Sequence, residues 1–199
     1  MPILSPDRID EVVELLLSGG VVAIPTDTVY GLAAVAIDSA SVAALADLKG
    51  REREQPIAVL IDSVEAVEPY LEQTRVLDTV ARFWPGALTA VVLARPGGLV
   101  APGGTEAATI GVRMPADDLA REVIRRCGGV LAVTSANHHG EPPATTAAEV
   151  ATAFGESLLI LDGGSRNSTA PSTVVDLSGP HPKILRAGPI SAADLGIEE

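Results

Sequence analysis

The chain has 199 residues, of which 47% are hydrophobic and 3% aromatic, and its formal net charge at pH 7 is −12. This length allows a sizeable buried core, which aliphatic side chains must fill, and this composition suits short strands packed on alanine-rich helices in an α/β fold. The acidic balance argues against a general nucleic-acid binder, because contacts with phosphates need a basic surface.

Cys127 is the only cysteine, so no disulfide can form within the chain and a reducing compartment is expected. The N-terminal residues lack the basic and apolar regions of a signal peptide, and no apolar run reaches membrane-spanning length. We therefore expect a soluble, cytoplasmic protein without a membrane association, in which the Cys127 thiol is packed.

A first helix is predicted from Ser5-Pro6-Asp7, which provide a cap and an acidic first turn, to Gly19-Gly20. The apolar run 21–25 then predicts a buried strand that ends in Thr26-Asp27-Thr28. Small polar groups at the end of a strand can bind a small ligand, although the same three residues could simply cap a turn.

A second strand is expected over residues 33–37, and a helix from about Ser39 to Leu48. Lys49, Arg51 and Arg53 follow at the carboxyl end of this helix, where cations also suit the helix dipole. The cluster could cap the helix or bind anions. Further along, residues 57–61 and 88–94 are predicted strands, and residues 64–71 and 75–83 are predicted helices.

The segment 95–105 is rich in glycine and proline and is expected to be a mobile loop that could act as a lid. Thr109 and Arg113 lie near the two ends of the next predicted strand and share one face of it, because side chains alternate with a period of two. An arginine on a largely apolar strand needs a partner.

Residues 119–126 are a predicted helix and residues 130–133 a predicted strand that ends in Thr-Ser-Ala-Asn, with Ser135 and Asn137 as polar groups. Strand ends of this kind collect ligands in α/β sheets. His138 and His139 follow without metal-ligand spacing, so they are expected to face solvent and no protein metal site is predicted.

The last elements are a helix at 149–154, a strand at 158–162, a polar loop at 163–171 that leads to residues 172–176, and a final strand that carries Arg186. Motifs along almost the whole chain, in the same order, resemble those of the YrdC/Sua5/TsaC family, the threonylcarbamoyl-AMP synthases. They are PTDTVYGL, KGR, FWPG, VRMP, TSAN with GEPP, PSTVVD and ILRAG.

The resemblance implies one YrdC-like domain over residues 1–199, an α/β fold in which helices flank a twisted mixed sheet with a concave groove. It also implies that L-threonine, bicarbonate and ATP, with Mg²⁺ accompanying the nucleotide, become threonylcarbamoyl-AMP and pyrophosphate. The product would serve the t6A37 modification of tRNA by a downstream threonylcarbamoyl transferase, with weak or no direct binding of nucleic acid.

The family's roles transfer to this chain by motif. Thr28, Arg113 and Ser172 would bind L-threonine, and Lys49 and Arg51 would be catalytic. The residues that would bind ATP are Lys49, Arg51, Thr109, Ser135, Asn137 and Arg186. The planar fork of arginine suits carboxylates and phosphates, whereas lysine offers a point charge to the transferring centre. Cations must converge on such anionic substrates even in an acidic protein.

Two positions depart from the family pattern. Gln55 replaces a basic residue before Pro56, with Arg53 as its possible substitute, and Leu60 stands where some members have a histidine that contacts threonine. Two other functions stay open on these grounds. One is a paralogue that binds nucleotide or RNA without catalysis. The other is a carbamoyl-transfer module of the hydrogenase-maturation type, which normally lies within a longer chain.

Overall fold

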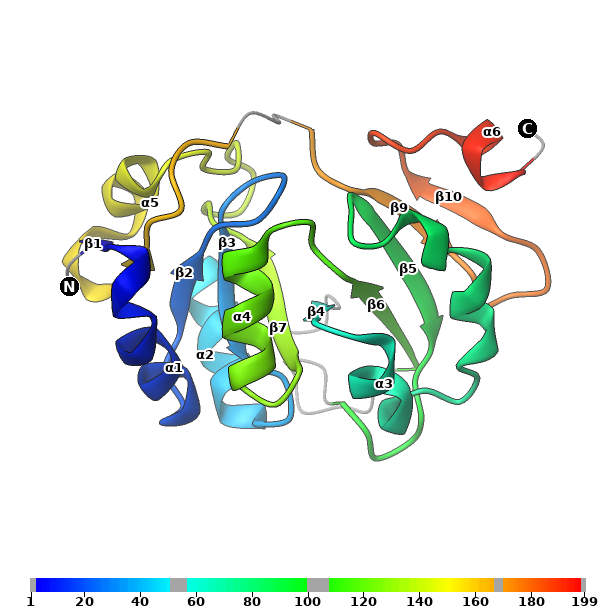
Figure 1. Ribbon diagram of the computed structural model, residues 1–199, viewed down its shortest axis with the longest axis horizontal. Helices are drawn as coiled ribbons and strands as arrows, with labels where there is room; N and C mark the ends of the chain where they lie inside the picture. Colours follow the sequence, from blue (N-terminus) through cyan, green and yellow to red (C-terminus); the bar gives the residue numbers. More distant parts are fainter. Residues whose placement is uncertain (1–2, 51–56, 100–107, 167–169, 198–199) are drawn as a thin grey trace.

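The computed structural model describes residues 3–50, 57–99, 108–166 and 170–197. Within these ranges one mixed sheet of ten strands runs along the molecule in the order β1-β8-β2-β3-β7-β4-β6-β5-β9-β10 (Figure 1). The strands are β1 (Ile3–Leu4), β2 (Val22–Ile24), β3 (Gly31–Val35), β4 (Ala58–Ile61), β5 (Leu88–Leu93), β6 (Thr109–Arg113), β7 (Val130–Ser135), β8 (Leu159–Leu161), β9 (Thr173–Asp176) and β10 (Lys183–Arg186).

The helical elements are mostly short. The α-helices are α1 (Ile9–Leu17), α2 (Ser39–Lys49), α3 (Val64–Val67), α4 (Asp118–Arg126), α5 (Ala147–Phe154) and α6 (Ala192–Leu195). The 3-10 helices are η1 (Pro6–Arg8), η2 (Glu68–Tyr70), η3 (Arg75–Thr79), η4 (Ala81–Phe83) and η5 (Gly155–Ser157). No helix in the described ranges combines the length and the apolar run that crossing a membrane requires.

The strands β2, β3, β4, β7 and β8 are buried on both faces of the sheet, and alternate side chains of one strand enter different cores. Ala23 and Leu32 belong to one apolar cluster, whereas Val22, Ile24 and Ala33 belong to the other. This alternation follows from the two-residue period of a strand. It explains why the strands of this chain are nearly continuous apolar runs.

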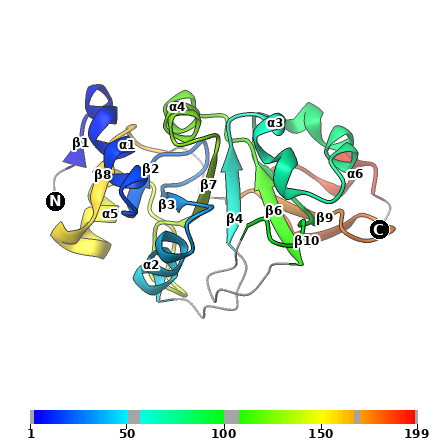
Figure 2. The ribbon, with the colours of Figure 1, turned by 90° about the horizontal axis from the view of Figure 1, so that it is seen from below.

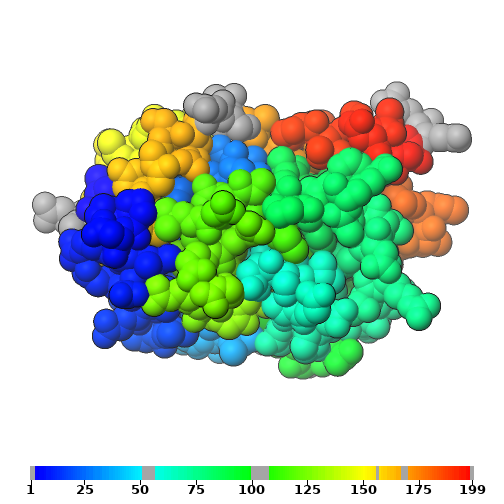
Figure 3. Space-filling view, in the orientation of Figure 1, coloured from blue at the N-terminus to red at the C-terminus, as the bar shows by residue number. Residues whose placement is uncertain are grey.

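Helices cover the two faces of the sheet. α1 and α4 lie on one face and α2 and α5 on the other (Figure 2). The apolar sides of α1 and α4 enter the second cluster, and those of α2 and α5 enter the first. In the space-filling view α1 and α4 cover the left part of the face turned to the viewer (Figure 3).

The predicted α/β fold with a mixed sheet flanked by helices is confirmed, and most of the predicted elements are present with shifted ends. The prediction of a continuous helix over 75–83 is wrong, because the structure has two 3-10 helices there. Val76, Thr79 and Val80 are β-branched and favour the α-helix weakly. The predicted helix over 64–71 is likewise a single α-turn followed by a 3-10 turn.

The start of the first helix also differs from the prediction. Pro6–Arg8 form a 3-10 turn, α1 begins at Ile9, and the Ser5 side chain makes no capping hydrogen bond. Two elements without a strong local signal were not predicted, β1 and α6. The single domain over 1–199 and the concave groove stay predictions, as does the lid, most of which lies outside the described residues.

Candidate functional site

The register of the sheet brings two polar strand ends to the same edge. Ile24 of β2 pairs with Gly31 of β3, and Gly31 pairs with Ser135 of β7. Gly31 permits this close approach, because a Cβ built there would lie 2.6 Å from a methyl group of Val133. The Thr26–Thr28 segment and the Ser135–Asn137 segment therefore leave the sheet side by side.

The residues that were predicted to bind L-threonine lie in a cluster with two arginines. We define this arginine cluster as Asp27, Thr28, Arg113, Ser172 and Arg186. Arg113 Nη1 donates to Thr28 Oγ1 at 3.1 Å, and Arg113 Nη2 forms an ion pair with Asp27 Oδ1 at 2.7 Å. The two charged side chains are 8% and 15% exposed, so this ion pair is largely desolvated. Asp27 is thus the partner that an arginine on an apolar strand requires.

The other half of the arginine cluster centres on Ser172. Arg186 Nη2 donates to the Ser172 carbonyl at 2.8 Å and to Ser172 Oγ at 3.0 Å, and Ser172 Oγ lies 2.8 Å from Thr89 Oγ1. Ser172 and Thr89 are both buried. Arg186 was predicted to bind ATP, yet it is hydrogen-bonded to a residue predicted to bind threonine, so the two predicted subsites meet here.

The two guanidinium groups influence one another. Burial lowers the pKa of Arg113, although Asp27 acts in the opposite direction. Burial also lowers the pKa of Arg186, and the positive charge of Arg113 lowers it further. Both groups remain cationic at neutral pH, because the ordinary pKa of arginine lies far above neutrality. Two cations near a single carboxylate make this region favourable for an added anion.

A lysine cluster, defined as Lys49, Ser135 and Asn137, lies at the edge described above. Lys49 Nζ donates to the Ser135 carbonyl at 2.6 Å, to Ser135 Oγ at 3.0 Å and to Asn137 Oδ1 at 2.7 Å. Lys49 is the last residue of α2, which Gly50 ends in the left-handed conformation at φ 64°. The end of α2 thus supplies the lysine, and the end of β7 supplies these acceptors of its ammonium group.

The Asn137 amide is oriented by its own neighbours. Its Nδ2 donates to the carbonyl of His138 at 2.8 Å and to that of Glu141 at 2.7 Å. These bonds identify the oxygen that faces Lys49 and hold the side chain in place. His138 and His139 are exposed, as expected. Among the described residues, no three His, Cys, Asp or Glu side chains are grouped to hold a metal ion.

Two predicted site residues remain, and the structure describes only Thr109 of these two. Thr109 is the first residue of β6 and pairs with Leu93 of β5, and it is partly buried. Arg51 lies outside the described residues, as do Arg53 and Gln55. Leu60, at the family's histidine position, is buried in the second apolar cluster.

The sequence prediction missed several residues that complete the site. It noted the carboxylate of Asp27 between two threonines but assigned it no role, although a buried arginine was known to need a partner. Thr89 carried no local signal, because its contact with Ser172 arises only where β5 pairs with β9. Arg166 and Asp117, described below, were missed for the same reason.

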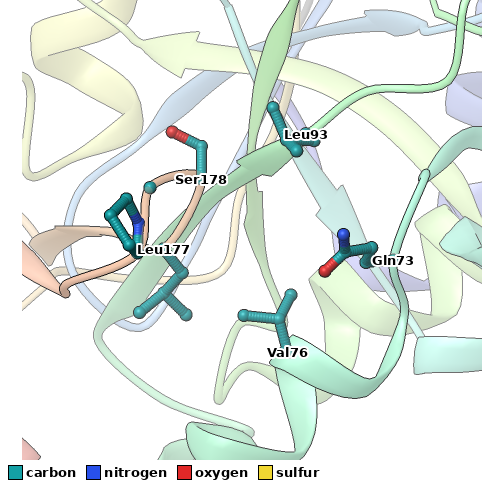
Figure 4. Close-up of a pocket in the computed structure, with 7 residues that line it drawn as sticks. Gln73, Val76, Leu93, Leu177 and Ser178 are labelled. Atoms are coloured by element: carbon teal, nitrogen blue, oxygen red, sulfur yellow. The ribbon is translucent and has the colours of Figure 1, made fainter.

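A pocket of about 320 Å³ lies away from both clusters, beyond the carboxyl ends of β5 and β9 (Figure 4). Its lining residues are Gln73, Val76, Leu93, Leu177, Ser178, Gly179 and Pro180. None of these side chains carries a charge, and none was predicted to be functional. The pocket therefore does not offer the cations that a phosphate or carboxylate needs.

Comparisons with known proteins identify the family of this chain. Residues 14–188 match the Sua5/YciO/YrdC family model, whose description is "Telomere recombination". A Mycobacterium tuberculosis protein is 41% identical over 177 residues, which are 87% of this chain and 81% of the relative. The Chromohalobacter salexigens threonylcarbamoyl-AMP synthase is 36% identical over 86% of this chain and 93% of its own.

Solved structures give the same result. Pyrococcus abyssi Sua5 complexed with L-threonine superposes with a TM-score of 0.89 and 33% identity, over 98% of this chain and 60% of that one. Escherichia coli YciO superposes with a TM-score of 0.81 at 20% identity, which shows a common fold alone. With a family match over 175 residues and relatives at this identity, the chain belongs to the Sua5/YciO/YrdC family.

Proposed function

We propose that this chain is an L-threonylcarbamoyladenylate synthase, which makes threonylcarbamoyl-AMP and pyrophosphate from L-threonine, bicarbonate and ATP. The observation that carries the proposal is the buried Arg113, held by Thr28 and Asp27 beside Ser172 and Arg186. The threonine-bound Pyrococcus abyssi structure supports a threonine site in this fold. The chain spans only 60% of that protein, so its full activity is not transferred by likeness alone.

The reaction makes demands that the two clusters can meet. The threonine nitrogen takes up the carbon of bicarbonate with loss of water, and a carbamate oxygen attacks the α-phosphorus of ATP. The bond from that phosphorus to pyrophosphate breaks. Arg113 would hold the threonine carboxylate, with Thr28 and Ser172 as hydroxyl partners, and Arg186 would neutralise a second anionic group.

Lys49, Ser135 and Asn137 are proposed to bind the nucleotide phosphates, and Arg51 and Thr109 are proposed as further ATP-binding residues. The lysine ammonium supplies charge near the transferring centre, and the hydroxyl and amide groups can donate without adding charge. Mg²⁺ is proposed to enter with ATP, whose phosphates supply oxygen ligands to this ion while it keeps several of its waters. Catalysis would then consist mainly of positioning and charge stabilisation.

The product is proposed to supply the t6A37 modification of tRNA through a separate threonylcarbamoyl transferase, in the cytoplasm. The acidic net charge of the chain supports a small-molecule product that is transferred to a separate enzyme, and it opposes direct binding of tRNA. The alternative of a nucleotide- or RNA-binding paralogue without catalysis is an outcome of the test below.

The test measures pyrophosphate release by the purified protein with ATP and Mg²⁺, with and without L-threonine and bicarbonate, and detects the adenylate by mass spectrometry. Release that requires both co-substrates and yields threonylcarbamoyl-AMP is the expected result. ATP binding without turnover would instead identify the non-catalytic paralogue. L-Allothreonine and L-serine serve as matched amino acids that probe the pocket around the side chain.

A further inference from the structure

Arg166 connects two segments that are distant in the sequence. It lies in the connection between β8 and β9, and its side chain is 13% exposed. Its Nη1 donates to the Thr26 carbonyl at 3.1 Å and pairs with Asp117 Oδ2 at 2.8 Å. One guanidinium nitrogen therefore links the segment after β2 to the start of α4, and both segments lie at the upper side of the sheet in Figure 1.

The anchor at Asp117 is itself fixed. Asp117 is the N-cap of α4, and its Oδ1 accepts from the Ala120 backbone nitrogen at 2.8 Å while Oδ2 faces Arg166. Oδ1 thus caps the helix and Oδ2 binds the guanidinium, so the start of α4 determines the position of the Arg166 guanidinium. Asp117 is 14% exposed, so solvent screens this ion pair less than a surface one.

The connection that carries Arg166 is held in place by further bonds. The Arg166 backbone nitrogen donates to the Thr145 carbonyl at 2.8 Å, and Arg166 Nε donates to the Gly164 carbonyl at 3.3 Å. Tyr30, buried beneath, donates to the same Gly164 carbonyl at 2.8 Å. The guanidinium also lies 5.9 Å from the centre of the Tyr30 ring. Arg166 is therefore a preorganised group rather than a free surface arginine.

From Thr26 the contacts continue into the arginine cluster. Thr26 Oγ1 accepts from the Thr28 backbone nitrogen at 3.2 Å and lies 3.1 Å from Thr28 Oγ1. Thr28 Oγ1 in turn accepts from Arg113 Nη1. A continuous series of contacts thus runs from Asp117 through Arg166, Thr26 and Thr28 to Arg113.

We propose that Arg166 is a positioning residue for the threonine site, which fixes the backbone of the Thr26–Thr28 segment so that Thr28 and Asp27 meet Arg113 in the geometry that binds L-threonine. This inference rests on the proposed function for the identity of the ligand. Arg166 does not contact the substrate in this scheme. Its effect should fall on the threonine side of the reaction and leave the lysine cluster unchanged.

The chemistry of arginine explains why this residue type is needed. The planar fork presents several N–H donors in fixed directions, so it can satisfy a carboxylate and backbone carbonyls together. A lysine at the same position keeps the charge towards Asp117 but offers a single donor centre. Arg166→Lys should therefore recover only part of what Arg166→Met loses.

The experiment compares Arg166→Met, Arg166→Lys and Asp117→Asn with Arg125→Met, which removes an exposed ion pair with Glu122 on the same helix. Asn at position 117 can still cap α4, so that variant removes the charge and spares the helix start. The dissociation constant of L-threonine is measured by calorimetry, and KM for L-threonine and for ATP by pyrophosphate release. Melting temperatures are recorded for every variant.

We expect Arg166→Met to weaken L-threonine binding about tenfold and to raise the KM for L-threonine by a similar factor, with the KM for ATP changed less than about twofold. Asp117→Asn should give a smaller loss in the same direction, and Arg125→Met none. A lower melting temperature in Arg166→Met with both KM values unchanged would overturn the proposal. Equal increases in the two KM values would overturn it as well.

A crystal structure of Arg166→Met separates this inference from the proposed function. If wild-type protein binds no L-threonine, the proposed function fails. The contact between Thr28 Oγ1 and Arg113 Nη1 in the structure of Arg166→Met then tests whether Arg166 positions the Thr26–Thr28 segment. Loss or displacement of that contact supports the role of Arg166. An unchanged Thr26–Thr28 segment in a folded variant contradicts it.

Discussion

The arginine cluster and the lysine cluster hold their buried cations in different ways. Arg113 faces a carboxylate, that of Asp27, and shares its surroundings with a second guanidinium. The oxygens that accept from Lys49 in the contacts with Ser135 and Asn137 are neutral. The ion pair orients Arg113 through a carboxylate, whereas these neutral acceptors orient the Lys49 ammonium group through hydrogen bonds.

This difference suits the two ligands that we propose. A single carboxylate such as that of L-threonine needs one well-oriented guanidinium, and Asp27 can orient Arg113 from behind. The phosphates of ATP carry several negative charges, and the lysine ammonium offers them a compact point charge. The clusters also differ in origin, because the contacts of Arg113 come from β6 and the segment after β2, and those of Lys49 from the ends of α2 and β7.

The largest expected effect is that of Arg113→Met. The substitution removes the guanidinium from the threonine site and should lower kcat/KM for L-threonine at least about 100-fold. It also leaves Asp27 desolvated without its cation, which should cost on the order of 3 kcal/mol of unfolding free energy. Denaturant unfolding and steady-state kinetics measure the two effects separately.

The double variant Arg113→Met with Asp27→Asn serves as the control for Arg113→Met. It removes both charges, so most of the lost stability should return while the threonine activity stays low. If activity returned together with stability, the guanidinium would have only a structural role. In that case Arg113 would not bind the carboxylate of L-threonine, and the proposed difference between the two clusters would be wrong.

Lys49→Met tests the other cluster. Loss of the ammonium should lower kcat about 100-fold and leave the calorimetric dissociation constant of L-threonine within about twofold of the wild-type value. Lys183→Met, on the exposed edge strand β10, is the matched control for the loss of one lysine. A large loss of threonine affinity in Lys49→Met alone would show that the two clusters form one binding site.

The sequence predicted the elements that carry the site better than the contacts within it. The apolar runs, the helix that ends at Lys49 and the polar residues after β2 and β7 all follow from local patterns. The demand of Arg113 for a partner could also be predicted from the cost of burying a charge. Its identity could not, because Asp27 lies 86 residues away in the chain.

Long-range contacts explain the remaining misses. Arg166 stands in a polar segment without periodicity, and nothing local to it indicates an ion pair with Asp117, 49 residues earlier. β1 has two residues and exists because β8 offers it a parallel edge. The error over residues 75–83 is different in kind, since apolar spacing favoured an α-helix and the weak helix propensity of β-branched residues opposed it.

Gly188→Ala should affect the arginine cluster alone. A Cβ at this position would lie 2.7 Å from the Pro171 carbonyl oxygen and 2.8 Å from the Ser172 carbonyl carbon, so the backbone that carries Ser172 must shift. We expect a loss of about 1–3 kcal/mol in unfolding free energy and weaker threonine binding. Gly179→Ala is the control, because a Cβ there meets nothing within 4 Å. Calorimetry with L-threonine checks the result, and unchanged binding in Gly188→Ala would contradict it.

The smallest effect concerns Cys127, a buried ionisable group outside both clusters. It shows how burial alone, without a proposed function, changes the pH dependence of stability. Burial raises the pKa of Cys127 to about 11, whereas an unfolded chain loses this proton near pH 8.5. Between these values the unfolded state binds fewer protons, so stability should fall as the pH rises from about 8.5 to about 11. Melting temperatures across this range should decline less in Cys127→Ala than in wild type, and turnover at neutral pH should not change. Parallel pH profiles of the two proteins would show that the thiol does not contribute.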